Sequence, residues 1–189
     1  MKYTIPAVIF AGGKSSRMGR DKALLPFGEY PTLAEYQYRK MQNIFESVYL
    51  SAKKNKFAFP AELICDRYEA SSPLAGIVSA FETLDTDALF VLSVDAPFIT
   101  EKVIAALFEA NRKNTDAVIA KSPDGIQPLC GIYKRSLLPF AKQQLLDNKH
   151  RLTSLLKQNR SRFIAFQDNT PFENLNHPHE YEAAIRRSV

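Results

Sequence analysis

Two groups of residues in this sequence have the types and spacing to handle phosphate. The segment of residues 11–22 combines the pair Gly12-Gly13 with several cations, among them Arg17 and Lys22. Glycines let a chain turn sharply and bring backbone N–H groups close to phosphate oxygens. Arginine adds a two-pronged donor, and lysine adds a point charge. The segment therefore predicts a site that binds a polyphosphate.

The spacing of this segment differs from two common phosphate-binding loops. A Walker loop needs a glycine five residues before its Gly-Lys-Ser, and Val8 occupies that position. The dinucleotide fingerprint Gly-x-Gly-x-x-Gly does not fit either. The alternative is a basic surface loop without a ligand. The coincidence of an apolar strand, a double glycine and interleaved cations favours phosphate binding.

Asp95 is the second candidate for chemistry. It follows the most apolar run of the chain, residues 88–94, and precedes Ala96-Pro97-Phe98. Ligands of open α/β sheets bind outside the carboxyl ends of the strands, so Asp95 and the glycine-rich segment are expected at the same edge. A carboxylate there can hold Mg²⁺, which bridges phosphate oxygens and offsets their charge. Taken alone, Asp95 would merely start a turn; the basic segment on the same edge favours the metal site.

Asp66 directly follows another predicted strand, residues 62–65. Its position alone fits a turn residue that ends a strand.

The elements that must position these residues follow from the apolar pattern. Apolar runs alternate with helical patterns, which favours βαβ units and a single α/β domain over residues 1–189. We predict a three-layer sandwich with a mostly parallel, Rossmann-like sheet. Because a Pro-Asp-Gly turn precedes the strand 127–133, that strand is expected to be antiparallel. The expected strands are 5–10, 48–52, 62–65, 88–94, 116–121, 127–133 and 163–166, and the expected helices are 31–45, 74–84, 100–112, 136–146, 152–158 and 178–187.

Composition narrows the class of protein. The 189 residues are 46% hydrophobic and 24% charged, with a net charge of +5, which are ordinary globular values. No stretch approaches the roughly 18 apolar residues of a membrane helix. The apolar run 5–11 is short and leads into charged sequence rather than a cleavage site, so it predicts a buried strand and not a signal peptide. We therefore expect a cytoplasmic protein.

The chain offers no arrangement typical of nucleophilic catalysis. Its three histidines all lie beyond residue 149, and no Ser-His-Asp or Cys-His arrangement is apparent. Cys65 and Cys130 share no metal-type spacing, which favours reduced, structural thiols. The segment His177-Pro178-His179, with Asn176 as cap, is better explained as a helix start than as a metal site.

These residues together resemble the molybdenum cofactor guanylyltransferase family, within the wider group of nucleotidyltransferases, and the resemblance covers most of the chain. The first motif is fairly specific for the group, and the combination indicates this family. The motifs are Ala11-Gly12-Gly13, Arg17-Met18-Gly19 and Asp21-Lys22-Ala23-Leu24-Leu25, then Ser72-Pro73-Leu74-Ala75-Gly76, Asp95-Ala96-Pro97-Phe98, and the weaker Gln127-Pro128 and Asn174-Leu175-Asn176-His177-Pro178.

The resemblance implies a set of site residues. GTP would contact the backbone at the end of the first strand and three side chains, that is, Phe10, Ala11, Gly12, Gly13, Lys22, Asp66 and Asp95. Asp95 would also bind Mg²⁺, with Mn²⁺ as an alternative ion. Ser51 stands where the family often has an asparagine that contacts GTP. The candidates for the acceptor side are Arg151, Asn174 and Asn176.

The reaction implied by the resemblance transfers GMP to the terminal phosphate of molybdopterin and releases pyrophosphate. A phosphate monoester is largely dianionic at pH 7, so no strong general base is required, and catalysis can rest on positioning and charge neutralisation. Asp95 would hold Mg²⁺ while Lys22 and Arg17 restrain the leaving pyrophosphate. Transient contact with the molybdoenzymes that accept the cofactor, or with their chaperones, is a further implied partnership.

Three alternatives stay open. A nucleotidyltransferase could use CTP or a sugar phosphate, although the double glycine and the segment 72–76 resemble guanylyl members more, and sugar-phosphate enzymes usually have longer chains. A non-catalytic nucleotide-binding adaptor is a second alternative, against which the intact Asp95 and Lys22 argue. Nucleic-acid binding is weakly supported, because the basic residues gather at one segment rather than along a helix or an aromatic sheet.

Overall fold

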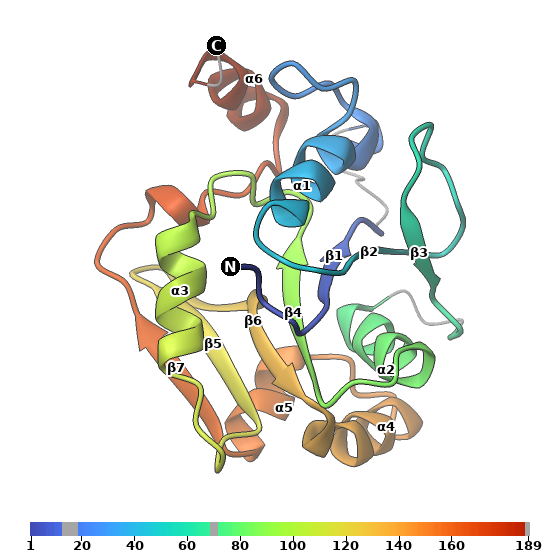
Figure 1. The fold of residues 1–189 in the computed structure, drawn as a ribbon, viewed down its shortest axis with the longest axis vertical. Helices are drawn as coiled ribbons and strands as arrows, with labels where there is room; N and C mark the ends of the chain where they lie inside the picture. The colour runs from blue at the N-terminus through green and yellow to red at the C-terminus, as the bar shows by residue number, and fades with distance from the viewer. Residues whose placement is uncertain (13–18, 69–71, 188–189) are drawn as a thin grey trace.

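A seven-stranded sheet forms the centre of the molecule (Figure 1). The computed structural model describes residues 1–12, 19–68 and 72–187. The strand order is β3-β2-β1-β4-β6-β5-β7, with β6 antiparallel to both of its neighbours and the other pairs parallel. The predicted mostly parallel sheet with one antiparallel strand is therefore confirmed. The strands are β1 (Ala7–Phe10), β2 (Val48–Ala52), β3 (Glu62–Cys65), β4 (Ala88–Ser93), β5 (Ala117–Ser122), β6 (Gly125–Lys134) and β7 (Ser161–Ala165).

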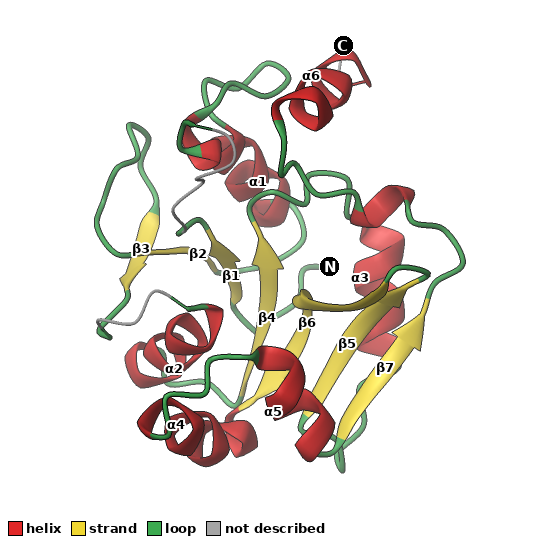
Figure 2. Ribbon diagram, turned by 180° about the vertical axis from the view of Figure 1, so that it is seen from behind, coloured by secondary structure: helices red, strands yellow, loops and turns green. Residues whose placement is uncertain are grey.

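Helices cover both faces of the sheet and complete the three layers (Figure 1; Figure 2). One face carries α1 (Leu33–Gln42) and α3 (Glu101–Glu109), and the other carries α2 (Pro73–Thr83), α4 (Leu138–Leu146) and α5 (Leu152–Gln158). The last helix, α6 (Pro178–Arg187), lies beside α1 at the end toward which β4 points. Short 3₁₀ helices form at η1 (Lys22–Leu24), η2 (Arg135–Leu137) and η3 (Thr170–Phe172).

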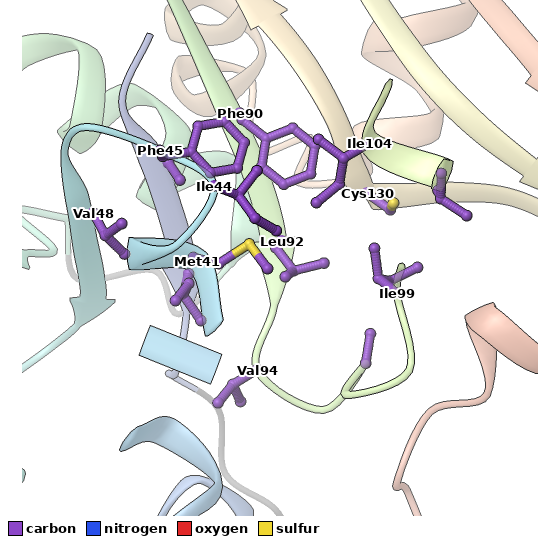
Figure 3. Close-up of a cluster of buried hydrophobic side chains, with 14 of the residues drawn as sticks. Met41, Ile44, Phe45, Val48, Phe90, Leu92, Val94, Ile99, Ile104 and Cys130 are labelled. Atoms are coloured by element: carbon purple, nitrogen blue, oxygen red, sulfur yellow. The ribbon is translucent and has the colours of Figure 1, made fainter. Parts of the chain in front are cut away.

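The central strand β4 feeds both hydrophobic layers, because its side chains alternate between the two faces. Phe90 and Leu92 pack toward α1 and α3, whereas Leu89 and Val91 pack toward α2 and α5. Figure 3 shows the first of these layers, where the rings of Phe90 and Phe45 stack at 5.0 Å. Burying a large apolar side chain contributes about 1.5–3 kcal/mol. The layers therefore hold the carboxyl end of β4 firmly in place.

Element boundaries differ from the predicted ones where proline and capping residues intervene. The first strand begins at Ala7 rather than residue 5, since Pro6 has no N–H to donate to a neighbouring strand. The first helix begins at Leu33 because the Thr32 hydroxyl accepts the backbone N–H of Glu35 at 3.1 Å and caps it. The helix predicted to begin at residue 74 begins one residue earlier, at Pro73, which fits the first helical turn.

Two further expectations concern thiols and membranes. Cys65 and Cys130 are both free, and Cys130 is buried while Cys65 is exposed. Burial raises the pKa of the Cys130 thiol to about 12, so this cysteine is an inert core residue. Across the described parts of the chain, no helix has the length and apolar character needed to span a bilayer.

Candidate functional site

Asp95 and Lys22 meet at the carboxyl edge of the sheet, just beyond β4. The Lys22 Nζ lies 2.5 Å from Asp95 Oδ2, and the Ser93 hydroxyl donates to Asp95 Oδ1 at 2.5 Å. The side chains of Lys22 and Asp95 are only 15% and 16% exposed. The expected meeting of the glycine-rich segment with Asp95 is confirmed by this ion pair. Both oxygens of the carboxylate therefore have protein donors.

Two polar residues of α1 hold the turn that carries Asp95. Gln37 is fully buried and donates to the carbonyl of Ala96 at 2.9 Å, and Lys40 donates to the carbonyl of Pro97 at 2.7 Å. Burial lowers the pKa of Lys40 to about 8, with partial compensation from the carboxylate of Glu101. Neither residue was predicted from the sequence. A buried glutamine on the apolar face of α1 is the one signal that could have pointed to them.

The segment that follows η3 contacts both members of this ion pair. The Asn176 Oδ1 accepts a hydrogen bond from Lys22 Nζ at 3.1 Å, and the Leu175 N–H donates to the carbonyl of Asp95 at 2.9 Å. The helix predicted to start near Pro178 does so. His177, and not the predicted Asn176, directly precedes this helix, and the Asn176 side-chain oxygen accepts from Lys22.

Glu180 organises the start of α6 and so positions Asn176. Its Oε2 accepts the backbone N–H groups of Asn176 at 2.7 Å and His177 at 2.9 Å. Burial opposes the charged form of Glu180, but these two N–H donors outweigh it and hold its pKa below the ordinary value. Glu180 was another residue that the sequence analysis did not single out.

A cavity of about 180 Å³ lies beside this ion pair, at the ends of β1 and β2. Four of the predicted nucleotide-binding residues line it, namely Phe10, Gly12, Ser51 and Asp66. The other lining residues are Ala52, Lys53, Ser72, Pro73, Gly76, Ser93 and Leu129. Ala11 is buried, and its N–H donates to the carbonyl of Ser51 at 3.0 Å. The cavity is polar where strands end and apolar where Phe10 and Leu129 approach.

Asp66 enters this cavity in a defined orientation. Its Oδ1 accepts the backbone N–H of Tyr68 at 3.1 Å and the hydroxyl of Ser79 at 3.2 Å. Ser79 is fully buried in α2 and also accepts the backbone N–H of Arg67 at 3.1 Å. Two donors thus hold one oxygen of Asp66, and the carboxylate lines the cavity. Ser79 was missed because a small hydroxyl residue inside an apolar helix gives no distinctive pattern.

Gly76 sets the wall of the cavity through its lack of a side chain. A Cβ at this position would lie 2.4 Å from Cε1 of the Phe10 ring, far below any normal carbon–carbon contact. The Phe10 ring can therefore pack flat against the first turn of α2 only because residue 76 is glycine.

A second cavity of about 210 Å³ lies on the other side of Asp95. Its lining includes Asp95 and Asn174 together with Gln127, Pro128 and Leu129 from the start of β6. A more open cavity of about 490 Å³ contains Asn174 and Asn176 as well. Ser93 and Leu129 line both the first and the second cavity. Ser93, whose hydroxyl donates to Asp95, therefore lies at their boundary.

Three of the predicted site residues are not among those that the structure places around Asp95 and the first two cavities. Arg151 lines a separate cavity between α4 and α5, although its neighbour His150 lies with Nδ1 3.2 Å from the Ser72 hydroxyl at the edge of the first cavity. Gly13 and Arg17 fall outside the described residues. Their predicted contacts with GTP stay predictions.

The donor set at Asp95 limits the kind of metal that could bind. Within residues 1–12, 19–68 and 72–187, no group of three or more His, Cys, Asp or Glu side chains is placed to hold a metal ion. Mg²⁺ is commonly bound by one or two carboxylates together with substrate phosphates and water. A single carboxylate beside a phosphate-binding segment fits that mode, and it does not fit a dedicated protein cage.

Comparison with known proteins decides the family. The model of the MobA-like NTP transferase domain matches residues 7–163, which is most of the chain. The chain belongs to this family. It is accordingly a nucleotidyltransferase, and the expected nucleotidyltransferase type of fold is confirmed.

Two relatives within the MobA-like family are named molybdenum cofactor guanylyltransferase. The one from Campylobacter jejuni is 37% identical over 177 residues, which cover 93% of this chain and 92% of that protein. The one from Helicobacter pylori is 36% identical over 187 residues, covering 96% and 88%. The resemblance inferred from the motifs is thereby confirmed.

Solved structures share the fold at lower identity. Molybdopterin-guanine dinucleotide biosynthesis protein A from Archaeoglobus fulgidus matches with a TM-score of 0.83 at 21% identity, covering 97% of this chain and 98% of that one. A CMP:2-keto-3-deoxy-manno-octonic acid synthetase complexed with CTP matches with a TM-score of 0.76 at 15% identity, covering 98% of each chain. The architecture is therefore common to MobA-like proteins and to other nucleotidyltransferases.

Proposed function

We propose that the protein is a molybdenum cofactor guanylyltransferase, which transfers GMP from GTP to the terminal phosphate of molybdopterin and releases pyrophosphate. The observation that carries this proposal is the ion pair of Lys22 and Asp95. The Asp95 carboxylate lines the second cavity and accepts a hydrogen bond from Ser93, which lines both cavities. The chain is also 36–37% identical to enzymes of that name over most of its length. Neither a CTP-dependent enzyme nor a sugar-phosphate enzyme has comparable support.

The first cavity is the proposed site for the nucleotide. Asp66 presents one carboxylate oxygen there, which can accept a hydrogen bond from the N1 or N2 edge of guanine. Phe10 and Gly76 form an apolar wall suited to a flat base. Gly12 lines this cavity, and Lys22 reaches Asp95 from η1. A backbone N–H group and a point charge there would suit a triphosphate.

The second cavity is the proposed site for the acceptor phosphate. Asn174 and Gln127 line it together with Asp95. Their side-chain amides can form hydrogen bonds with an uncharged or an anionic ligand. In the transfer, an oxygen of the acceptor phosphate forms a bond to the α-phosphorus of GTP. The bond from that phosphorus to the bridging oxygen breaks, and its electron pair leaves with pyrophosphate. Because the acceptor phosphate is already largely dianionic, no side chain has to remove its proton.

Asp95 is the residue proposed to hold Mg²⁺, or Mn²⁺ in its place. When bound, the ion would neutralise charge on the phosphate oxygens. Lys22 shares that task on the leaving pyrophosphate, and its contact with Asn176 keeps the ammonium in the site. Since Lys22 already pairs with Asp95, binding of the metal and the triphosphate requires these two side chains to share or exchange partners.

The experiment that tests the proposal measures pyrophosphate release. The protein is incubated with Mg²⁺, molybdopterin and each of GTP, CTP, ATP and UTP in turn. We expect release with GTP that depends on molybdopterin and on the metal. Equal or greater release with CTP would overturn the guanylyl assignment, and no release with any nucleotide would favour the adaptor alternative. The cytoplasmic location and the contact with molybdoenzymes or their chaperones also remain proposals, and co-purification with such an enzyme tests the second.

A further inference from the structure

Lys56, in the connection between β2 and β3, makes contacts that set it apart from its neighbours. Its Nζ donates to the carbonyl of Ala11 at 2.8 Å and to Asp21 Oδ2 at 2.5 Å, and it lies 5.7 Å from the centre of the Phe57 ring. The Lys56 side chain is only 17% exposed, whereas Lys54 is exposed. A lysine that gives up most of its hydration must gain from specific partners.

The two acceptors of Lys56 stand at the two ends of the glycine- and arginine-rich segment. Ala11 directly follows β1 and is itself tied to β2 through its N–H bond to the carbonyl of Ser51. Asp21 stands at the start of η1, where its Oδ1 accepts the backbone N–H of Ala23 at 3.1 Å and caps that turn. One ammonium group therefore connects the entrance and the exit of the segment.

The exit that Lys56 holds leads directly to the ion pair of the site. Asp21 precedes Lys22, the first residue of η1, and Lys22 reaches Asp95 and Asn176 from there. A shift of Asp21 would move the backbone of Lys22, and the ammonium group would then no longer approach Asp95 along the same path. Lys56 can thus influence the site without touching it.

We propose that Lys56 is a positioning residue that fastens the two ends of the phosphate-binding segment to each other and so fixes Lys22 before the nucleotide arrives. This inference rests on the proposed function, since the segment is taken to bind the triphosphate of GTP. The charge of Lys56 is engaged by Asp21 and Ala11, so it acts through them and not on the phosphates. Preorganisation of this kind lowers the ordering cost of binding and appears as affinity.

The test compares Lys56→Met with Lys56→Arg and with the exposed control Lys54→Met. Steady-state pyrophosphate release gives KM and kcat for GTP, and equilibrium binding is measured for GTP and for guanosine, which lacks phosphates. We expect Lys56→Met to raise the KM for GTP about tenfold, the scale of one charge-assisted hydrogen bond, while guanosine binds as before. Lys56→Arg should recover most of the affinity, and Lys54→Met should match the wild type. An unchanged KM in Lys56→Met, or an equal loss for GTP and guanosine, would overturn the inference.

A double-mutant cycle with Asp21→Asn separates positioning from direct contact with phosphate. If Lys56 acts through Asp21, the double variant loses about as much GTP affinity as either single variant. If Lys56 instead binds the phosphates, Asp21→Asn alone leaves GTP affinity unchanged or improves it. The loss of GTP affinity in the double variant then comes from Lys56→Met alone. That second pattern contradicts the positioning role.

Hydrogen exchange distinguishes failure of this inference from failure of the proposed function. If the wild-type protein neither binds nor turns over GTP, the proposed function is wrong. The fastening of Asp21 by Lys56 can still be tested at η1. In Lys56→Met, amide exchange at residues 23–25 should become faster than in the wild type, because their N–H groups bond to Asp21 and Lys22. Unchanged exchange there shows that Lys56 does not fasten this turn.

Discussion

The ammonium of Lys22 lies 2.5 Å from the carboxylate of Asp95, although 73 residues separate them in the chain. The pair joins the exit of the glycine-rich segment to the end of the central strand. Ser93 donates to the other oxygen of Asp95, so the carboxylate is held from both sides. On the proposed function, substrate and metal would have to reorganise this charged pair.

Replacing the carboxylate of Asp95 with an amide should abolish most of the transfer reaction. Asp95→Asn keeps the shape but removes the charge that would hold the metal, which is worth several kcal/mol. We expect pyrophosphate release to fall on the order of 10³-fold, with circular dichroism showing a folded protein. Asp85→Asn, on an exposed carboxylate after α2, serves as the control. Full activity of a folded Asp95→Asn protein would refute the assignment.

Loss of the Ser79 hydroxyl should weaken selection of the base. Ser79→Ala removes one of the two donors that hold Asp66 Oδ1 and leaves the Arg67 N–H without its acceptor. We expect the KM for GTP to rise about five- to tenfold and the preference for GTP over ATP to narrow, with kcat little changed. Thr83→Ala, at the exposed end of the same helix, is the matched control. A lower Tm without any change in nucleotide preference would leave Ser79 with a structural role only.

Two glycine substitutions should distinguish an effect on GTP kinetics from an effect on stability alone. In Gly76→Ala the new methyl group meets the Phe10 ring at 2.4 Å, and in Gly131→Ala it meets the carbonyl oxygen of Val118 at 2.5 Å. Both should lower the free energy of unfolding by about 1–3 kcal/mol, as overpacking usually does. Only Gly76→Ala should also raise the KM for GTP, because Phe10 lines the cavity proposed for the nucleotide. Denaturant unfolding and GTP kinetics on the two variants check this, and an equal effect on KM would contradict it.

The stabilisation from Glu180 should depend on pH. Its folded pKa lies below the ordinary value of 4.5, so its contribution is fully present above pH 4.5 and is lost as the pH falls through the folded pKa. We expect Glu180→Gln to lower the Tm at about pH 7, with the difference from the wild type shrinking toward about pH 3. The exposed Glu182→Gln on the same helix is the control. A Tm difference that persists unchanged in acid would show that the charge of Glu180 is not the cause.

Short apolar runs bounded by turn residues predicted the sheet well. The strands at 48–52 and 62–65 and the helices at 152–158 and 178–187 have the predicted bounds. The last strand was predicted at 163–166 and runs from Ser161 to Ala165. Its polar first residues pair with β5 through backbone groups alone, and backbone pairing leaves no apolar pattern in a sequence.

The site was predictable only where residues follow a strand or stand in a glycine-rich segment. Lys22, Asp66 and Asp95 satisfy that rule, and the structure brings them to one edge. Gln37 and Glu180 act from helices, where a polar residue usually means a solvated face. Glu180 could therefore not be recognised, and the only signal for Gln37 was its place on the apolar face of α1. The β6 residues Gln127 to Leu129 reach the same edge because β6 runs antiparallel to β4 and so begins near the end of β4. Only the family resemblance indicated Gln127 and Pro128, and Leu129 was not predicted.

The wall between the two cavities has a consequence for how such enzymes diversify. Of the described residues that line the two cavities, only Ser93 and Leu129 belong to both. On the proposed function, one set of elements, chiefly β1, β2 and α2, would select the base. Another set, the start of β6 and the segment after η3, would select the acceptor. We therefore expect base preference and acceptor preference to be exchangeable one at a time, by mutation or by grafting, around an unchanged Asp95.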